Sequence, residues 1–373
     1  MTTSTEKIWR PFIVGELFRL EPGKAKGLNH LEQDERGIPY LGATNRNNAV
    51  LAFVRPVEKL IQRGNCIAFI RNGEGSVGYS VYKQEDFIAT SDITCGYADF
   101  LNKYVGLFIT TVADKVRGKY NFNYKRSDTR LKKERLMLPV NDDGSPDFVF
   151  MESYVRAIEE KLLQRYRDFA QEKLSELGNG GGCISLPPLN EKRWAEFLFT
   201  DVFRIEKGFY NKKPTASGAG KIPFLGATEN NNGITEFYTY DEIANASKVG
   251  YGKNESIDRK IFEGNAIAVT NNGSVGHAFY QPTPFTCSHD INPLYLKNYQ
   301  LNESIALFLI DCIEKQGICF AYARKWRPIR MINSKIFLPV NDEGAPDFEY
   351  MEAYAKNLEA EKYRKYLAYI GDD

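Results

Sequence analysis

Two basic stretches, 200 positions apart, carry the residues of this chain best suited to binding chemistry. Residues 115–135 include nine Lys or Arg and two acids, and residues 315–335 include six Lys or Arg and no acid. Aromatic residues such as Tyr124 and Trp326 lie among the charges. Cationic side chains neutralise phosphates, and Arg, Lys and Asn also contact base edges. The recurrence favours nucleic-acid binding over a solvated charged face, which would be the simpler explanation of one isolated run.

Asparagine-rich segments form a second recurring candidate: residues 44–48 read Thr-Asn-Arg-Asn-Asn and residues 228–232 read Thr-Glu-Asn-Asn-Asn. Asn contacts bases but also tolerates turn conformations, so a plain turn is an equal alternative. Glycine-rich segments at 72–76 and 271–274 lack the lysine and the spacing of a P-loop and are expected to be hairpin turns. The residues predicted to contact nucleic acid are Thr44, Asn45, Arg46, Asn47, Asn72, Lys119, Tyr124, Lys125, Arg126, Arg130, Thr228, Asn230, Asn231, Asn272, Tyr322, Arg324, Lys325, Trp326, Arg327 and Arg330.

No catalytic set is recognisable in the sequence. The chain lacks a Walker motif, an HExxH motif and a Gly-x-Ser-x-Gly elbow, and its six Cys and three His residues show no metal-ligand spacing. Asp92 and Asp290 match between the copies, but a metal-dependent nuclease would need such acids clustered with a lysine, so an anchoring role in loops is favoured. We therefore predict a binding protein with no catalytic residue, metal or cofactor of its own. A nuclease or methyltransferase that uses Asp92 and Asp290 is the alternative.

The overall composition limits the class of protein. The chain has 373 residues, with 49 Lys and Arg against 48 Asp and Glu. The resulting net charge of +1 excludes a grossly basic protein but not a local basic surface. The sequence contains neither a run of 18 apolar residues nor a signal peptide, which predicts a cytoplasmic protein without membrane contact.

The elements that must position the candidate residues also occur twice. The 17 residues Leu138–Tyr154 return as Leu338–Tyr354 with 12 identities, and Gly75–Gly78 returns as Gly273–Gly276. Matched blocks lie between 184 and 200 positions apart, and the pairs Trp9 with Trp194 (185) and Leu138 with Leu338 (200) illustrate the drift. The insertions therefore fall between matched blocks, as expected of loops on a shared scaffold.

Each copy is predicted to contain short strands, then a helix before the basic stretch, then a long helix. In the first copy the run at 67–70 and its return at 77–82 predict a hairpin, and helical spacing covers 102–116. The second copy repeats this order at 267–270, 275–280 and 302–314. The predicted fold class is α/β (α+β), with two tandem domains of mixed short strands and helices. The predicted boundaries are 1–149 for the first domain, 150–178 for its helix, 179–189 for a linker, 190–349 for the second domain and 350–373 for its helix.

The sequence resembles the specificity subunits of restriction-modification systems, both type I and BcgI-like type IIB. The resemblance covers nearly the whole chain. It is carried by Ile-Pro-Tyr-Leu-Gly-Ala-Thr-Asn at 38–45 with its copy at 222–229, by the Gly-Ser-Val-Gly turns, and by the basic-aromatic stretches that lead into Leu138 and Leu338. Such a subunit has two target recognition domains, each reading half of a split DNA site. The resemblance also implies two long helices paired as an antiparallel coiled coil, and no enzymatic activity in this subunit.

The resemblance implies double-stranded DNA as one partner and two copies of a methyltransferase or fused restriction-methylation subunit as the other. S-adenosylmethionine and Mg²⁺ would belong to that subunit. It would dock on helix residues Val155, Ile158, Leu162, Phe169, Leu358 and Tyr366.

Base choice would lie in residues that differ between the copies, such as Arg46 against Asn230 and Arg126 against Trp326. Phosphate contacts would come from shared positions, including Lys125 with Lys325 and Arg130 with Arg330. A scaffold that binds an acidic DNA-mimic protein is a further alternative.

Overall fold

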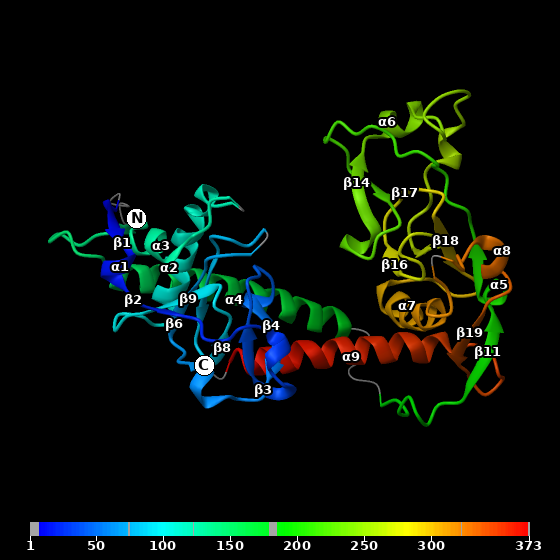
Figure 1. The fold of residues 1–373 in the computed structure, drawn as a ribbon. Coiled ribbons are helices and arrows are strands. Elements are labelled where there is room, and N and C mark those ends of the chain that lie inside the picture. The colour runs from blue at the N-terminus through cyan, green and yellow to red at the C-terminus, as the bar shows by residue number, and fades with distance from the viewer. Residues whose placement is uncertain (1–6, 74, 122, 179–184, 322, 372–373) are drawn as a thin grey trace, which may run out of the picture. The chain divides into compact units, whose positions relative to one another are not determined.

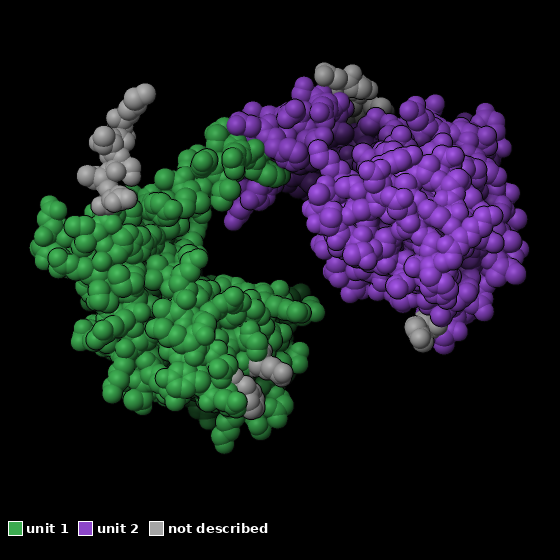
Figure 2. Space-filling model, turned by 90° about the horizontal axis from the view of Figure 1, so that it is seen from above, with its two compact units in different colours: residues 1–166 green, residues 167–373 purple. Residues whose placement is uncertain are grey.

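The computed structural model describes residues 7–73, 75–121, 123–178, 185–321 and 323–371. The chain divides into two compact units, residues 1–166 (unit 1) and 167–373 (unit 2) (Figures 1 and 2). Each unit carries one copy of the repeated strands. The predicted domain boundaries stay predictions, and residues 179–184 of the predicted linker lie outside the described residues.

Unit 1 is built on three sheets. Its strands are β1 (Trp9–Ile13), β2 (Arg19–Pro22), β3 (Gln33–Leu41), β4 (Val50–Val54), β5 (Ile61–Gln62), β6 (Cys66–Ile70), β7 (Ser80–Lys83), β8 (Phe87–Ala89), β9 (Ile93–Tyr97) and β10 (Arg135–Pro139). One sheet has the antiparallel order β2-β9-β6-β7, and a second has the order β4-β3-β8-β5 with β3 and β8 parallel. The third is the antiparallel pair of β1 and β10.

Unit 2 repeats this plan. Its strands are β11 (Trp194–Leu198), β12 (Phe203–Ile205), β13 (Ile222–Leu225), β14 (Ile234–Tyr238), β15 (Ala266–Thr270), β16 (Ala278–Gln281), β17 (Thr286–Cys287), β18 (Ile291–Leu296) and β19 (Lys335–Pro339). The sheets are β12-β18-β15-β16, β14-β13-β17 and the pair of β11 and β19. Where unit 1 has β5, unit 2 has only an isolated bridge between Phe262 and Phe285.

The helices confirm the predicted order. They are α1 (Val14–Leu17), α2 (Lys103–Lys115), α3 (Asp128–Lys132), α4 (Phe148–Gly178), α5 (Phe199–Val202), α6 (Tyr240–Asn245), α7 (Glu303–Gly317), α8 (Pro328–Met331) and α9 (Phe348–Tyr369). Helix α4 has 31 residues, or about 46 Å at 1.5 Å per residue, and α9 has 22. Both begin two residues earlier than predicted. No helix of the described residues is both long and apolar enough to cross a membrane.

The two predicted hairpins are confirmed as the antiparallel pairs β6–β7 and β15–β16. Their second strands nevertheless start at Ser80 and Ala278, later than predicted. The reason is the glycine turn, in which Gly78 has φ 91° and Gly276 has φ 92°. Glycine tolerates this left-handed conformation, and the longer turn places the start of the second strand further along the chain.

The core of each unit lies on both faces of its central strand. All five residues of β6 are buried. Ile67 and Phe69 pack in one cluster with α2, whereas Cys66, Ala68 and Ile70 pack in another on the opposite face, as strand alternation requires. β15 divides its residues between two clusters in the same way. Because both faces of these strands are held by the core, the residues that follow each strand are fixed in place.

Helix α2 offers a test of the local packing. Asn102 Oδ1 accepts hydrogen bonds from Tyr104 N (2.9 Å) and Val105 N (3.0 Å), and its Nδ2 donates to Glu152 Oε2 (2.7 Å) on α4. Asn102→Ala removes the cap and should lower the free energy of unfolding by about 1–2 kcal/mol, measured by denaturant titration. Asn302→Ala, which uncaps α7 at Ile305 N, should have a similar cost. A neutral result at both positions would contradict the capping role.

Candidate nucleic-acid interface

In unit 1, separate loops meet at the carboxyl end of β6. Ser76 Oγ donates a hydrogen bond to Ala43 O (2.6 Å), which joins the turn after β6 to the loop after β3. Arg126 N donates to Arg71 O (3.2 Å), which joins the basic stretch to the same turn. We define loop cluster 1 as residues 42–49, 71–73, 75–79, 90–93, 117–121 and 123–130. The structure therefore brings together the predicted segments around Thr44–Asn47, Asn72 and Lys119–Arg130.

Unit 2 brings the equivalent segments together. Trp326 N donates to Asn271 O (3.1 Å), and His277 Nε2 lies 3.6 Å from Glu229 Oε2. The backbones of Gly276 and Gly317 touch, since a Cβ on either one would lie 2.8 Å from the Cα of the other. We define loop cluster 2 as residues 226–233, 270–277, 288–291, 317–321 and 323–330. The predicted contact residue Tyr322 lies outside the described residues.

The matched aspartates anchor these loops. Asn72 Nδ2 donates to Asp92 Oδ1 (3.0 Å), and Asn272 Nδ2 donates to Asp290 Oδ1 (2.9 Å). The anchoring role favoured from the sequence is confirmed. Within the described residues, no group of three His, Cys, Asp or Glu side chains is placed to hold a metal ion.

The asparagine-rich segments are turns whose tips remain exposed. Asn47 has φ 48° and Asn231 has φ 52°, a left-handed conformation that Asn tolerates better than most residues. Thr44 Oγ1 accepts from Arg46 N (3.2 Å), and Thr228 Oγ1 makes the same bond in unit 2. The turn interpretation therefore accounts for Thr44, Asn47, Thr228 and Asn231. It leaves the exposed side chains of Asn45, Arg46 and Asn230 available to a ligand.

In both basic stretches, one arginine side chain donates a hydrogen bond to a backbone carbonyl of the same stretch. Arg130 Nη1 donates to Lys125 O (2.7 Å), and Arg330 Nη1 donates to Lys325 O at the same distance. The Arg130 guanidinium also lies 3.9 Å from the centre of the Tyr124 ring. The exposed residues of the predicted set in these stretches are Lys119, Tyr124, Lys125, Arg324, Arg327 and Arg330.

Two predicted base-reading residues are instead buried. Arg126 and Trp326 are both 0% exposed. Arg126 Nε donates to Glu134 Oε2 (3.0 Å), and Trp326 Nε1 donates to Ser334 Oγ (2.8 Å). A side chain enclosed by the core cannot touch a base edge, so the prediction that these two residues contact DNA is wrong.

Sequence reasoning missed several polar residues of the clusters. Arg71 Nη1 pairs with Asp128 Oδ2 (3.0 Å), and the Arg117 guanidinium lies 4.2 Å from the centre of the Tyr79 ring. In unit 2, Glu229 and His277 were also missed. Tyr79 and His277 directly follow the matched Gly-Ser-Val-Gly turns and Glu229 ends the matched block 222–229, so for these three residues the repeat was the available signal.

A model of the family described as the type I restriction modification DNA specificity domain matches residues 6–165 and 184–366. The chain belongs to this family. The two matches account for most of the chain and correspond to the two copies. The predicted class, a specificity subunit of a restriction-modification system that recognises DNA sequence, is confirmed.

Individual relatives agree with this assignment. The chain is 30% identical over 348 residues to the specificity subunit S.BcgI of a type II restriction enzyme from Heyndrickxia coagulans, covering 93% of this chain and 94% of that protein. The S subunit of a type I restriction-modification system from M. genitalium has a similar structure, with a TM-score of 0.58 at 14% identity. That match covers 100% of this chain and 94% of the other, and it supports the fold.

The anchoring role of Asp92 generates a test against the enzyme alternative. Asp92→Asn keeps the Oδ1 acceptor for Asn72, so the complex with its partner should retain methylation and DNA binding. Asp92→Ala removes the acceptor and should weaken DNA binding by about 3–10-fold, the value of one hydrogen bond. Both quantities can be measured on the purified complex. Loss of reaction in Asp92→Asn with DNA binding intact would instead assign Asp92 a catalytic role.

Proposed function

We propose that each unit reads one half of a two-part duplex DNA site and that the chain directs a separate modification or restriction subunit to it. The observation that carries this proposal is the loop cluster, which occurs once in each unit with its basic stretch in the same place. The methylation and cleavage chemistry, with S-adenosylmethionine and Mg²⁺, belongs to the partner.

Phosphate contacts are assigned to the positions that both clusters share. Lys125 and Lys325 lie at equivalent places, and the same arginine-to-backbone bond orients Arg130 and Arg330. Base contacts are assigned to exposed positions that differ, above all Arg46 in cluster 1 against Asn230 in cluster 2. Shared cations supply affinity for any duplex, whereas the differing side chains supply sequence choice.

The long helices are proposed as an antiparallel spacer between the two half-sites. Within unit 2, Arg167 Nη2 donates to Ile370 O (3.2 Å), and the rings of Phe169 and Tyr363 lie 6.0 Å apart. The later residue of α4 therefore contacts the earlier residue at the C-terminal end of the chain, which supports antiparallel pairing of α4 and α9. A helical pair of fixed length would hold the half-sites at a fixed separation.

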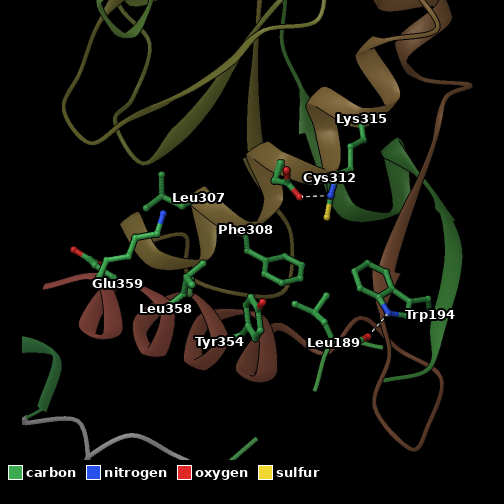
Figure 3. Close-up of a pocket in the computed structure, with 12 residues that line it drawn as sticks. Leu189, Trp194, Leu307, Phe308, Cys312, Lys315, Tyr354, Leu358 and Glu359 are labelled. Atoms are coloured by element: carbon green, nitrogen blue, oxygen red, sulfur yellow. Dashed lines mark hydrogen bonds and ion pairs between the residues drawn. The ribbon is translucent and has the colours of Figure 1, made fainter. Parts of the chain in front are cut away.

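Each unit also carries an apolar groove beside its long helix. Groove 1 has a volume of about 660 Å³ and is lined chiefly by Trp9, Leu107, Phe108, Tyr154, Val155 and Ile158. Groove 2 has a volume of about 550 Å³ and is lined chiefly by Trp194, Leu307, Phe308, Tyr354, Ala355 and Leu358. Figure 3 shows Leu307 and Phe308 on α7 facing Tyr354 and Leu358 on α9.

The two grooves share their aromatic framework. Trp9 stacks on Phe108 at 5.9 Å and Trp194 on Phe308 at 6.3 Å, and each Phe meets a tyrosine of the long helix edge-on. Two like grooves fit two copies of one partner, each contributing an amphipathic helix. Three of the predicted docking residues, Val155, Ile158 and Leu358, line the grooves.

The remaining docking residues, Leu162, Phe169 and Tyr366, do not line these grooves. Phe169 instead contacts Tyr363 on α9, which supports a role in helix pairing.

The DNA contact is tested by reversing charge at Lys125, which is exposed, and at the half-buried Arg130. Lys125→Glu with Arg130→Glu should weaken binding of the complex to its duplex and reduce the slope of log affinity against log salt by about 2, because two phosphate contacts are lost. Affinity is measured across a salt series. The matched control is Lys59→Glu with Arg63→Glu, exposed residues at the other end of β6, which should leave affinity and slope unchanged. Equal effects of the two variants would reject this interface.

The partner contact is tested on the groove walls. Ile158 is 43% exposed and Leu358 is 42% exposed, so their replacement by Asp should leave the fold intact. Each substitution places a charge in an apolar groove and should weaken one partner contact by roughly 30-fold, the scale of an interface hot spot. Native mass determination of the complex should then show one partner copy lost per substitution. Ser153→Asp, on a different face of α4, should retain both copies, and full occupancy in all variants would contradict groove docking.

A further inference from the structure

The buried residues Arg126 and Trp326 hold equivalent places, and each links the basic stretch of its loop cluster to neighbouring segments. In unit 1, Arg126 Nη1 donates to Gly78 O (3.1 Å) and to Ser80 Oγ (3.1 Å) at the glycine turn. On its other side the guanidinium makes two bonds to Glu134, one from Nε at 3.0 Å and one from Nη2. One side chain therefore connects the glycine turn with the residue that precedes β10.

The same ion pair holds Tyr120, the first residue of the basic-aromatic turn, which we define as residues 120–121 and 123–126. Tyr120 OH donates to Glu134 Oε2 (2.5 Å), and the Arg126 guanidinium lies 5.7 Å from the centre of the Tyr120 ring. Burial, then the bond to Glu134, raises the pKa of Tyr120, so its hydroxyl stays a donor. The fit is tight, because a Cβ on Gly78 would lie 2.9 Å from Arg117 and 3.1 Å from Tyr120. The glycine turn and the basic-aromatic turn are therefore held together by these contacts.

In unit 2 the basic stretch is tied to the core without a charged side chain. Trp326 stacks on Phe320, the equivalent of Tyr120, with ring centres 4.8 Å apart and an angle of 10° between the rings. Its edge meets Phe199 at 5.3 Å. Ser334 stands at the position of Glu134 and accepts the bond from Trp326 Nε1. The linkage between the turn and the core is here a ring stack and one neutral hydrogen bond.

We infer that Arg126 and Trp326 are positioning residues for sequence reading, and that half-site choice in unit 1 depends on a buried charge pair whereas in unit 2 it depends on ring stacking. The inference rests on the proposed function, in which these turns contact DNA. Neither residue touches DNA. Each fixes where its exposed neighbours stand, and the planar fork of arginine does so with several directed donors. A displaced turn misplaces Lys125 and Arg130 together with the glycine turn.

The test removes the charge pair without leaving a lone buried charge. Arg126→Met with Glu134→Gln keeps similar side-chain volumes, and Gln retains an oxygen for the Tyr120 hydroxyl, whereas removing one partner alone would strand the other. The full complex is selected against a duplex library randomised in both half-sites, and base preferences are read by sequencing. The preference at the half-site of unit 1 should fall by about tenfold or more, the scale of a lost specific contact. The other half-site should keep its preference.

A matched variant addresses unit 2. Trp326→Phe with Ser334→Ala keeps a ring against Phe320 but removes the hydrogen bond, and it should lower preference at the other half-site by roughly threefold. Thermal unfolding establishes that both double variants are folded. Unchanged preference in the folded Arg126 variant, or equal loss at both half-sites, would overturn the inference. If Lys125→Glu with Arg130→Glu also leaves DNA binding intact, the proposed interface itself fails, which is a separate outcome.

Discussion

Both units depend on an aspartate at the junction between sheet and long helix. Asp147 Oδ1 accepts a hydrogen bond from Phe150 N (2.9 Å) at the start of α4, and its Oδ2 pairs with Lys7 Nζ at 2.6 Å. Asp347 repeats both contacts on α9, with Lys192 Nζ at 2.6 Å. A carboxylate is favoured at a helix N-terminus, and each lysine shortly precedes the first strand of its unit. This contact therefore fixes the long helix to the two-stranded sheet, and its aspartate is one of the identical residues of the repeated 17.

The sequence is sufficient to predict the elements that have a periodic pattern or a repeat. The hairpins, α2, α7 and the long helices follow from spacing, and the repeat shows that they occur twice. The sequence does not predict which charged side chains are buried in the folded chain. Arg126 resembles a surface cation because charged residues are seldom fully buried, and its partner Glu134 lies eight positions away with no pattern to reveal the pair. Exposure at Asn45 and Arg46 likewise depends on how the turn closes, which composition does not determine.

The inserted segment of unit 2 is held by polar contacts of its own. Unit 2 contains an insertion around α6. The Lys260 side chain, which is 0% exposed, binds this insertion through hydrogen bonds. Its Nζ donates to Ala244 O (2.8 Å), Ala246 O (2.9 Å) and Asn254 Oδ1 (2.5 Å). Burial lowers the pKa of Lys260, yet these acceptors satisfy its donors. An insertion anchored by its own polar contacts can change without disturbing the shared strands, as the two proposed reading surfaces on one scaffold require.

The two units use different buried pairs at the same place: Arg126 with Glu134 in unit 1, and Trp326 with Ser334 in unit 2. A buried ion pair seldom adds more stability than well-packed apolar residues of similar volume, so unit 1 has no need of the pair for folding alone. Unit 2 packs the same place with rings. What the two solutions share is the linkage between the basic-aromatic turn and the core, and in unit 1 the pair reaches the glycine turn as well. Divergence between the two proposed DNA-reading surfaces therefore extends beneath the exposed side chains, into the buried residues that hold them in position.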